Sequence, residues 1–292
     1  MDETVSNPFS GIPTHAVGLH LSRSAIKMSH SPSWRVDKSN ATHDLMICLT
    51  GSGKYQVNDA HFSLTPGQAF LAPAGTRFIG QATSSERYTG IAQHFTLDLF
   101  GTVDMIGQMT LRPMATIPDW DVYGPMLQYY QDTAPATSTT LQQHHKFMAI
   151  LLKYLEAAFV GWREKAVGAM EGQDALSLHI MLAAARLTAD PLSNDILQRT
   201  LERAPYNPDY FRRAFRDRIG QTPQKFLELK KMENAMHELM LGKSVKEVAA
   251  AVGYQDAYFF SRMFKRYMGE PPSTYRLKSR DKALRERDLS SE

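Results

Sequence analysis

The sequence is poor in the residues on which covalent cross-links and membrane anchors depend. Cys48 is the one cysteine among 292 residues, so no disulfide can form within the chain. No uninterrupted apolar run reaches the length of about 20 residues that a transmembrane helix needs, and residues 1–10 do not resemble an apolar leader. These absences favour a cytoplasmic protein that contacts no membrane.

Motifs that carry catalysis or hold metals are also missing. The sequence has no nucleophile elbow, no phosphate-binding glycine loop and no paired zinc-ligand spacing. Cys48 lies in an apolar run without a basic neighbour, and a buried cysteine of this kind is usually inert. His43, His61 and His94 are scattered, so structural or surface roles are the simpler interpretation. We therefore expect no enzyme activity and no metal or other cofactor.

Charge is divided unevenly along a chain whose formal net charge is only +3. Residues 1–175 contain 12 Lys and Arg against 15 Asp and Glu, a net charge of −3, whereas residues 176–292 contain 21 against 15, a net charge of +6. A basic half joined to a mildly acidic half is typical of a polyanion-binding domain attached to a domain with another task.

The strongest local signal is the stretch 242–276, which predicts a helix-turn-helix. Ser244 and Glu247 have the spacing of a capping box, so a helix begins directly after Ser244. Gly253 ends this helix, and Asp256, a common N-cap residue, starts a second helix of about three turns.

This second helix has two different faces. Its inward positions at helical spacing are apolar or aromatic: Phe260, Met263, Phe264 and Tyr267. The opposite positions are Tyr258, Ser261, Arg262 and Lys265. A guanidinium, a hydroxyl and an amine on one helix face can reach base edges and phosphates in a major groove of DNA.

The same pattern occurs a second time, 49 positions earlier in the chain. The shift superposes Arg213, Phe215, Arg216, Gly220, Pro223 and Phe226 on Arg262, Phe264, Lys265, Gly269, Pro272 and Tyr275. A fixed repeat indicates two copies of one unit. The first copy turns Asp209, Arg212, Arg213 and Arg216 outward. Between the copies, a helix that Thr222-Pro223 opens and Gly242 ends would hold two recognition helices at a fixed separation.

The segments VKEVA, VGY, FFSRMFK and GEPPSTYR of the second copy resemble the signature of the AraC/XylS-type transcription regulators. The resemblance implies a domain of about seven helices that binds double-stranded DNA in successive major grooves and contacts RNA polymerase. It places the DNA-binding residues at Asp209, Arg212, Arg213, Arg216, Ala257, Tyr258, Ser261, Arg262 and Lys265. The first copy departs from the pattern, with Leu201 in place of a small alanine and Lys231-Met232 in place of Arg-Leu.

From His43 onward, short apolar runs alternate with turn residues, which predicts a small antiparallel barrel or sandwich. The segments GSG and LTPGQAFLAPAG resemble the cupin-like sensing domain of the same regulators. A metal-cupin enzyme is the alternative from another class. However, Phe78 stands where metal cupins have a histidine, and no His-x-His pair follows Gly53.

A barrel of this kind would hold a small-molecule effector, and a sugar would need aromatic faces and polar side chains. The candidate effector-binding residues are Trp34, Arg35, Thr50, Arg77 and His94. The alternative for each of them is an ordinary strand residue that faces water or the core. A regulator controlled by a protein partner is a further alternative.

Helices are expected at residues 119–131 and 141–165. In the second, Met148, Leu151, Leu152, Leu155, Phe159 and Trp162 make an apolar stripe that either packs on the barrel or forms a homodimer seam. Both interpretations stay open. The stretch 166–175 is the expected interdomain linker.

We therefore predict an α+β protein of two domains. Residues 1–165 form a cupin-like antiparallel β-barrel with helices for effector binding and dimerisation. Residues 176–292 form an all-α double helix-turn-helix. The predicted function is sequence-specific DNA binding by a transcription regulator, more specifically an activator.

Overall fold

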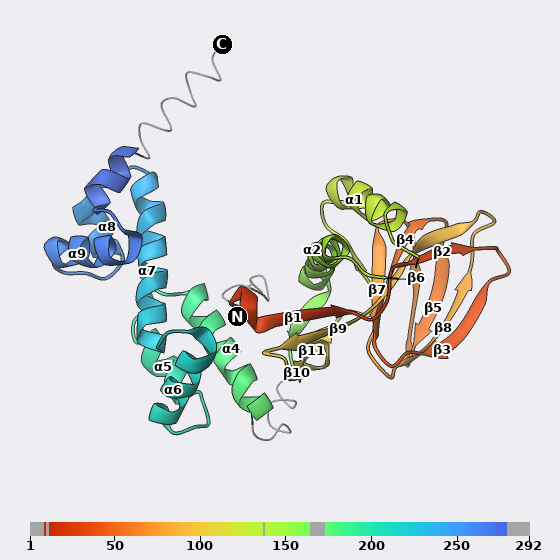
Figure 1. Ribbon diagram of the computed structural model, residues 1–292, viewed down its shortest axis with the longest axis horizontal. Helices are drawn as coiled ribbons and strands as arrows, with labels where there is room; N and C mark the ends of the chain where they lie inside the picture. Colours follow the sequence, from red (N-terminus) through yellow and green to blue (C-terminus); the bar gives the residue numbers. More distant parts are fainter. Residues whose placement is uncertain (1–8, 10–11, 137, 164–172, 279–292) are drawn as a thin grey trace, which may run out of the picture. The chain divides into compact units, whose positions relative to one another are not determined.

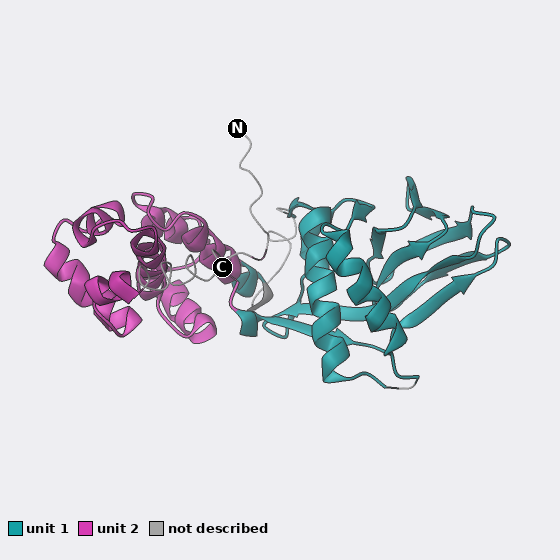
Figure 2. Cartoon of the chain, turned by 90° about the horizontal axis from the view of Figure 1, so that it is seen from above, with its two compact units in different colours: residues 1–8, 14–178 teal, residues 9–13, 179–292 magenta. Residues whose placement is uncertain are grey.

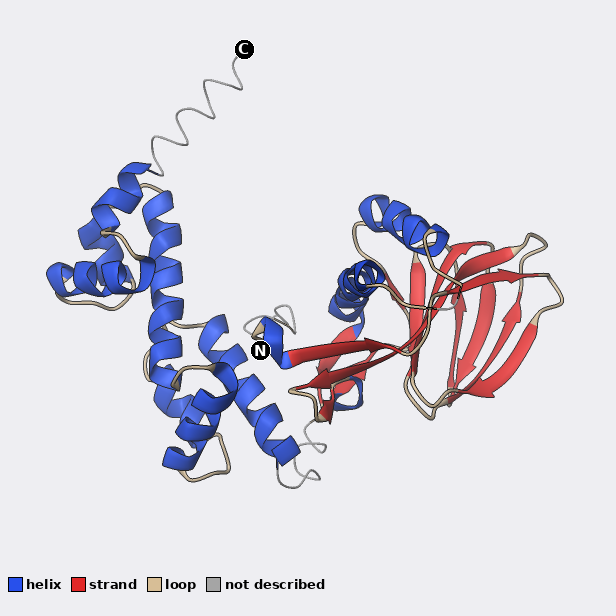
Figure 3. Ribbon diagram, in the orientation of Figure 1, coloured by secondary structure: helices blue, strands red, loops and turns tan. Residues whose placement is uncertain are grey.

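The computed structural model describes residues 9, 12–136, 138–163 and 173–278 of the chain (Figure 1). Contacts divide the chain into two compact units: residues 1–8 and 14–178 form the first, and residues 9–13 and 179–292 form the second (Figure 2). The first is rich in strands and the second is helical, as the sequence predicts (Figure 3). Most of the linker expected at 166–175 lies outside the described residues, and residues 173–175 already belong to a helix.

Two antiparallel sheets make up the core of the first unit. The larger sheet contains β1 (Val17–Leu21), β2 (Ile26–His30), β4 (His43–Thr50), β7 (Gln68–Ala72), β9 (Tyr88–Leu99), β10 (Val103–Asp104) and β12 (Ala115–Thr116), and its main order is β1-β9-β4-β7-β12. The smaller has the order β3-β8-β5-β6 and contains β3 (Arg35–Ser39), β5 (Gly53–Val57), β6 (Ala60–Leu64) and β8 (Arg77–Ala82). Short 3-10 turns lie at Thr14–Ala16 and Ile106–Gln108.

The two sheets share an aromatic core. Phe70 and Tyr88 of the larger sheet pack with Tyr55 and Phe78 of the smaller one, and all four are nearly inaccessible to solvent. The hydroxyl groups of Tyr55 and Tyr88 lie 2.8 Å apart, so each finds a hydrogen-bond partner within the core. Residues that alternate along each strand therefore bury one face of each sheet against the other.

A close backbone approach fixes the centre of the larger sheet. Gly90 of β9 lies beside β4, where a Cβ atom would come within 2.1 Å of the Ile47 carbonyl oxygen. The ladder between these two strands shifts register between Cys48 and Thr50. Only glycine fits at this position because the bulge brings the two backbones together.

Two helices cover the other face of the larger sheet: α1 (Trp120–Asp132) and α2 (Leu141–Ala158). Tyr130 of α1 donates a hydrogen bond to Oε1 of Gln93 on β9, over 2.5 Å. Phe147 of α2 packs edge-on against Phe95 of the same strand. The buried side of α2 therefore serves the barrel, which is the first of the two interpretations of its apolar stripe.

The helix expected at 141–165 is shorter than predicted. It ends at Ala158, and β13 (Phe159–Trp162) continues as a strand that pairs with β11 (Met109–Leu111). The prediction was wrong here because an apolar stripe cannot show that a pairing edge is available to satisfy the backbone of residues 159–162. Phe159 and Trp162 consequently pack against each other at the end of a strand and not along a helix.

The second unit contains a chain of helices. They are α4 (Gln173–Ala189), α5 (Ile196–Glu202), α6 (Pro208–Ile219), α7 (Pro223–Met240), α8 (Val245–Ala251) and α9 (Ala257–Met268), followed by a helical segment at 272–278. Within the described part of the chain, this makes the seven helices that the resemblance implies. The contact boundary between the units falls inside α4, between residues 178 and 179.

The caps of α8 and α9 confirm the predicted helix-turn-helix. The Ser244 hydroxyl accepts a hydrogen bond from the Glu247 backbone N–H, and the Glu247 carboxylate accepts one from the Ser244 N–H. Gly253 follows α8 with a φ angle of +85°, which favours glycine. Asp256 caps α9 by accepting from the backbone N–H of Tyr258.

Candidate nucleic-acid interface

The helix α9 has two faces: an exposed one, its candidate recognition face, and a buried aromatic one that packs the helix in place. Phe260 and Phe264 are fully buried against α7 and α8. Tyr258 is 85% exposed, and Arg262 and Lys265 are also exposed. The helical period therefore separates a packed face from one that is free to contact DNA.

The side chain of Arg262 rests on an aromatic ring. Its guanidinium carbon lies 5.6 Å from the centre of the Phe259 ring, within the range of a cation–π contact. Phe259 is 45% exposed, and the sequence analysis did not single it out. Its position three residues before Arg262 is the signal that would have identified it. Ser261, by contrast, donates its hydroxyl to the Ala257 carbonyl, and both residues are half-buried.

The corresponding helix of the first copy, α6, is built in the same way. Asn207 Oδ1 accepts hydrogen bonds from the backbone N–H groups of two residues in the first turn, and Pro208 occupies the first helical position. Phe211 and Phe215 are buried, while Arg213 and Arg216 are exposed. The repeat seen in sequence thus extends to the cap, the core face and the basic face.

Asp209 is the acidic member of the α6 face and pairs with a neighbouring arginine. Its Oδ1 lies 2.9 Å from Nη1 of Arg212, and the Asp209 side chain is 84% exposed. An exposed ion pair of this kind contributes about 1 kcal/mol at most. Its effect is to orient the Arg212 guanidinium and to reduce the positive charge at the start of α6.

Among the described residues, the remaining basic groups of the two faces have no acidic partner. In the part of the chain that the structure describes, no carboxylate lies within ion-pair distance of Arg213, Arg216, Arg262 or Lys265. Their charges are therefore available to phosphates.

The helix α7 connects the two recognition helices. Phe226 of α7 packs against Phe215 of α6, and Glu228 accepts a 2.7 Å hydrogen bond from the Tyr267 hydroxyl of α9. Its 18 residues give a length of about 27 Å. Both recognition helices are thus attached to one continuous rod.

The candidate effector residues do not form one cluster. Arg35 and Arg77 are exposed, where Arg35 donates to Gln81 and Arg77 forms a bidentate pair with Asp37. Thr50 is exposed at the end of β4, with its hydroxyl 2.6 Å from that of Thr89. None of these three side chains lies in the buried space between the sheets.

Trp34 and His94 do face the space between the sheets, but at different places. Trp34 stacks on His30 and packs beside Tyr88. Nε2 of His94 lies 3.2 Å from Oδ2 of the fully buried Asp44. Because His94 is six residues from Tyr88 along β9, these two places are about 20 Å apart.

Other reactive groups are few in the described residues. These contain no cluster of three or more histidine, cysteine, aspartate or glutamate side chains that could hold a metal ion. Burial raises the pKa of the Cys48 thiol to about 12, so it stays protonated near neutral pH. Among the described helices, none combines the length and the apolar character needed to cross a bilayer.

A family model described as a helix-turn-helix domain matches residues 201–278, from within α5 to the end of the described chain. Residues 201–278 form an AraC-type helix-turn-helix domain. Two curated regulators are similar to this AraC-type domain. The raffinose operon transcriptional regulatory protein of Pediococcus pentosaceus is 40% identical over 68 residues, which are 23% of this chain and 24% of that protein. The MmsAB operon regulatory protein of Pseudomonas aeruginosa is 49% identical over 63 residues, 21% of this chain and 20% of that protein.

The chain therefore spans about a quarter or less of the length of these two relatives. Among solved structures, ToxT from Vibrio cholerae is similar over 88% of this chain and 98% of its own, with 12% identity and a TM-score of 0.33. A cupin superfamily protein from Desulfitobacterium hafniense is similar over 28% of this chain and 76% of its own, with 16% identity and a TM-score of 0.22.

Proposed function

We propose that the protein is a sequence-specific DNA-binding transcription regulator. The observation that carries this proposal is the duplicated basic face. The helices α6 and α9 each bury phenylalanines and expose arginines, Arg213, Arg216 and Arg262, that have no acidic partner among the described residues, and α7 joins the two helices. The similarity of the AraC-type domain to two operon regulators supports it.

Each recognition helix makes two kinds of contact with DNA. Lysine and arginine displace counterions from phosphates and supply salt-dependent affinity. A few outward side chains then discriminate between bases. The proposed contacts are Asp209, Arg212, Arg213, Arg216, Ala257, Tyr258, Ser261, Arg262 and Lys265. Because Ser261 is held by the Ala257 carbonyl, the longer side chains Arg262 and Lys265 make the deeper contacts of α9.

The length of α7, which joins the two helices, is of the same order as the groove repeat on one side of a duplex. The α7 rod is about 27 Å long, and successive major grooves on one face of B-DNA repeat at about 34 Å. The exposed side chains extend the reach of each recognition helix beyond the rod. One chain thus covers two grooves.

We further propose that the first unit senses a small molecule, with a sugar or a sugar derivative as the first class to test. His94 and Trp34 remain candidates because both face the inter-sheet space. The regulator acts in the cytoplasm as an activator that contacts RNA polymerase. Control by a protein partner is the alternative, and it predicts co-purification of that partner and no thermal shift with any small molecule.

A homodimer completes this proposal. Val122 and Tyr129 lie seven residues apart on one face of α1 and are 60% and 52% exposed. Exposed apolar side chains on one helix face offer a surface on which a second copy of the chain could pack. Sedimentation equilibrium of the wild type and of Val122→Glu tests this point, and the variant is expected to be monomeric.

A selection of bound fragments from random DNA, followed by hydroxyl-radical footprinting, tests the proposed function. We expect two protected segments on one side of the duplex, about one helical turn apart. The selected sites should share a sequence in both segments. Binding that shows no preferred sequence, or protection of only one segment, would contradict the proposal.

A further inference from the structure

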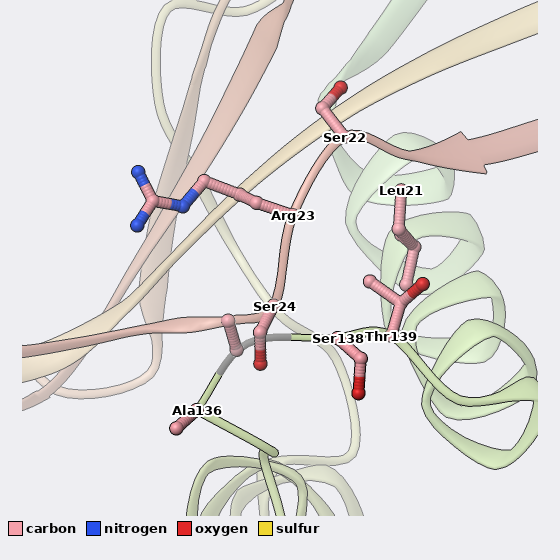
Figure 4. A pocket seen from close by; sticks show the side chains of 8 residues that line it. Leu21, Ser22, Arg23, Ser24, Ala136, Ser138 and Thr139 are labelled. Atoms are coloured by element: carbon pink, nitrogen blue, oxygen red, sulfur yellow. The ribbon is translucent and has the colours of Figure 1, made fainter.

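A cavity of about 620 Å³ lies beside the turn between β1 and β2 in the first unit (Figure 4). Ser22, Arg23 and Ser24 line one side of it, and Ser138 and Thr139 line the other. Figure 4 shows the Arg23 side chain directed away from Ser138 and Thr139, and the Ser24 hydroxyl is inaccessible to solvent. The lining therefore offers a ligand no convergent set of polar groups.

Each recognition helix of the second unit exposes an aromatic ring in its first turn. Phe259 of α9 is 45% exposed, and Tyr210 of α6 is 40% exposed. The two positions are 49 residues apart (259 minus 210), which is the period of the repeat, so they are equivalent in the two copies. An exposed arginine follows each ring three residues later, Arg262 in α9 and Arg213 in α6. An aromatic residue paired with an arginine is therefore part of the duplicated unit.

A second pair of aromatic side chains supports the two exposed rings. The centre of the Phe259 ring lies 5.9 Å from that of Tyr254, and the centre of the Tyr210 ring lies 6.1 Å from that of Tyr206. Each supporting tyrosine also packs against the first buried phenylalanine of its recognition helix: Phe260 in α9 and Phe211 in α6. The exposed rings are thus preorganised, and little conformational entropy is lost when they contact a partner.

In α9 the exposed ring also orients the arginine. The guanidinium carbon of Arg262 lies 5.6 Å from the centre of the Phe259 ring, so the two groups contact each other. Both lie toward the N-terminal end of the helix, which is the end that contacts base edges in a helix-turn-helix. Arginine pairs with guanine, whose O6 and N7 atoms accept two hydrogen bonds. Because base pairs are stacked about 3.4 Å apart, the ring and the guanidinium can contact neighbouring base pairs.

The chemistry of a phenyl ring selects the kind of base that it contacts. Phe259 has no charge and no hydrogen-bonding group, so it neither displaces counterions from phosphates nor pairs with the polar edge of a base. The apolar group that the major groove presents is the C5-methyl group of thymine, and phenylalanine is among the side chains that contact it. Such a contact removes apolar surface of both partners from water. Tyr210 offers the same ring with one added hydroxyl group.

We propose that Phe259 is a specificity-determining residue, which contacts the methyl group of a thymine beside the guanine bound by Arg262, and that Tyr210 has the same role beside Arg213. Each half-site of the operator therefore contains a thymine and a guanine on neighbouring base pairs. This inference rests on the proposed function, because it names the bases that the two recognition helices discriminate.

The test replaces single thymines of the selected operator by deoxyuridine. This change removes one methyl group and leaves the sugar, the phosphate and the base-pairing edge as they were. Fluorescence anisotropy measures the affinity of the full chain for each operator. For the wild type we expect a loss of roughly 3-fold to 10-fold at one thymine in each half-site, which corresponds to one buried methyl group. Replacement of the other thymines should change the affinity little.

Phe259→Ala and Tyr210→Ala are matched controls for each other. Phe259→Ala should bind the thymine and deoxyuridine operators equally in the α9 half-site and keep the wild-type response in the α6 half-site. Tyr210→Ala should show the reverse. The response that each variant retains shows that its second unit is folded. The half-site of each helix is the one whose base preference is relaxed by Arg262→Ala or by Arg213→Ala.

Two outcomes overturn the inference. The first is a wild type that binds every deoxyuridine operator as tightly as the thymine operator, and the second is a Phe259→Ala variant with the full wild-type response in the α9 half-site. In both cases a shared sequence in the two half-sites would leave the proposed function in place. A selection that yields no common sequence would overturn the proposed function and this inference together, so the two failures are distinguishable.

Discussion

Replacing Arg213 and Arg262 by alanine, singly and together, tests the duplicated recognition face directly. Each arginine is exposed and has no acidic partner in the described structure, so each is expected to contact DNA. Loss of one arginine contact costs about 1–3 kcal/mol, which is a fall in operator affinity of roughly 5-fold to 150-fold.

The double variant gives a sharper expectation. The two side chains extend from separate helices joined by a rod of about 27 Å, and distant contacts are usually additive within about 0.5 kcal/mol. We therefore expect the losses to sum to about 2–6 kcal/mol. Stability should change little, because within the described residues the guanidinium contact is that of Arg262 with the exposed Phe259 ring, worth about 0.5–1 kcal/mol.

Fluorescence anisotropy with the selected operator and with operators mutated at each position measures affinity and specificity together. Arg87→Ala, in the first unit, is the matched control for loss of one positive charge. Each recognition variant should tolerate substitutions at its own operator position and keep its preference at the others. If both single variants bind with wild-type affinity, or if the double variant loses no more than either single one, two independent reading helices are excluded.

Three further predictions concern stability and reactivity. Ser244→Ala should lower the free energy of unfolding of the second unit by about 1 kcal/mol in urea titrations. Hydrogen bonding to Ser244 lowers the pKa of Glu247, so the stability from this carboxylate is present above its ordinary pKa of 4.5 and is lost as the pH falls below it. The variant lacks part of this contribution and should therefore lose less stability than the wild type on acidification. Tyr130→Phe should destabilise the first unit by about 1–3 kcal/mol in the same assay, because it leaves the buried Gln93 amide oxygen unpaired; an unchanged midpoint would refute this. Cys48, whose pKa is raised to about 12, should resist a thiol reagent at pH 8 until the chain is unfolded, and rapid labelling of the native protein would show that it is accessible.

The helix-turn-helix was predictable because its determinants are local. Caps such as Ser244 with Glu247, and Asn207 with Pro208, act within one turn, and the alternation of phenylalanine and arginine follows the helical period. The sequence therefore predicted α8 and α9 nearly to the residue, and the outward face of α6. The residues proposed to bind DNA follow from the same period, and they stay predictions until binding is measured.

The first unit was less predictable because its determinants lie far apart in the chain. The end of α2 at Ala158 depends on pairing of residues 159–162 with β11, about 50 residues earlier. The hydrogen bond from Gln93 to the Arg23 carbonyl joins positions 70 residues apart. No period in the local sequence indicates such contacts, which is why the five effector candidates did not converge.

The continuous helix α7 also limits how the position of one recognition helix can change relative to the other. Adding a single residue within it would rotate everything beyond that point by about 100° and advance it by about 1.5 Å. One recognition helix would then be turned out of its groove while the other stayed in place. Viable changes in the length of this rod therefore come in steps close to whole helical turns, so the spacing of the DNA half-sites is restricted by helix phase as well as by distance.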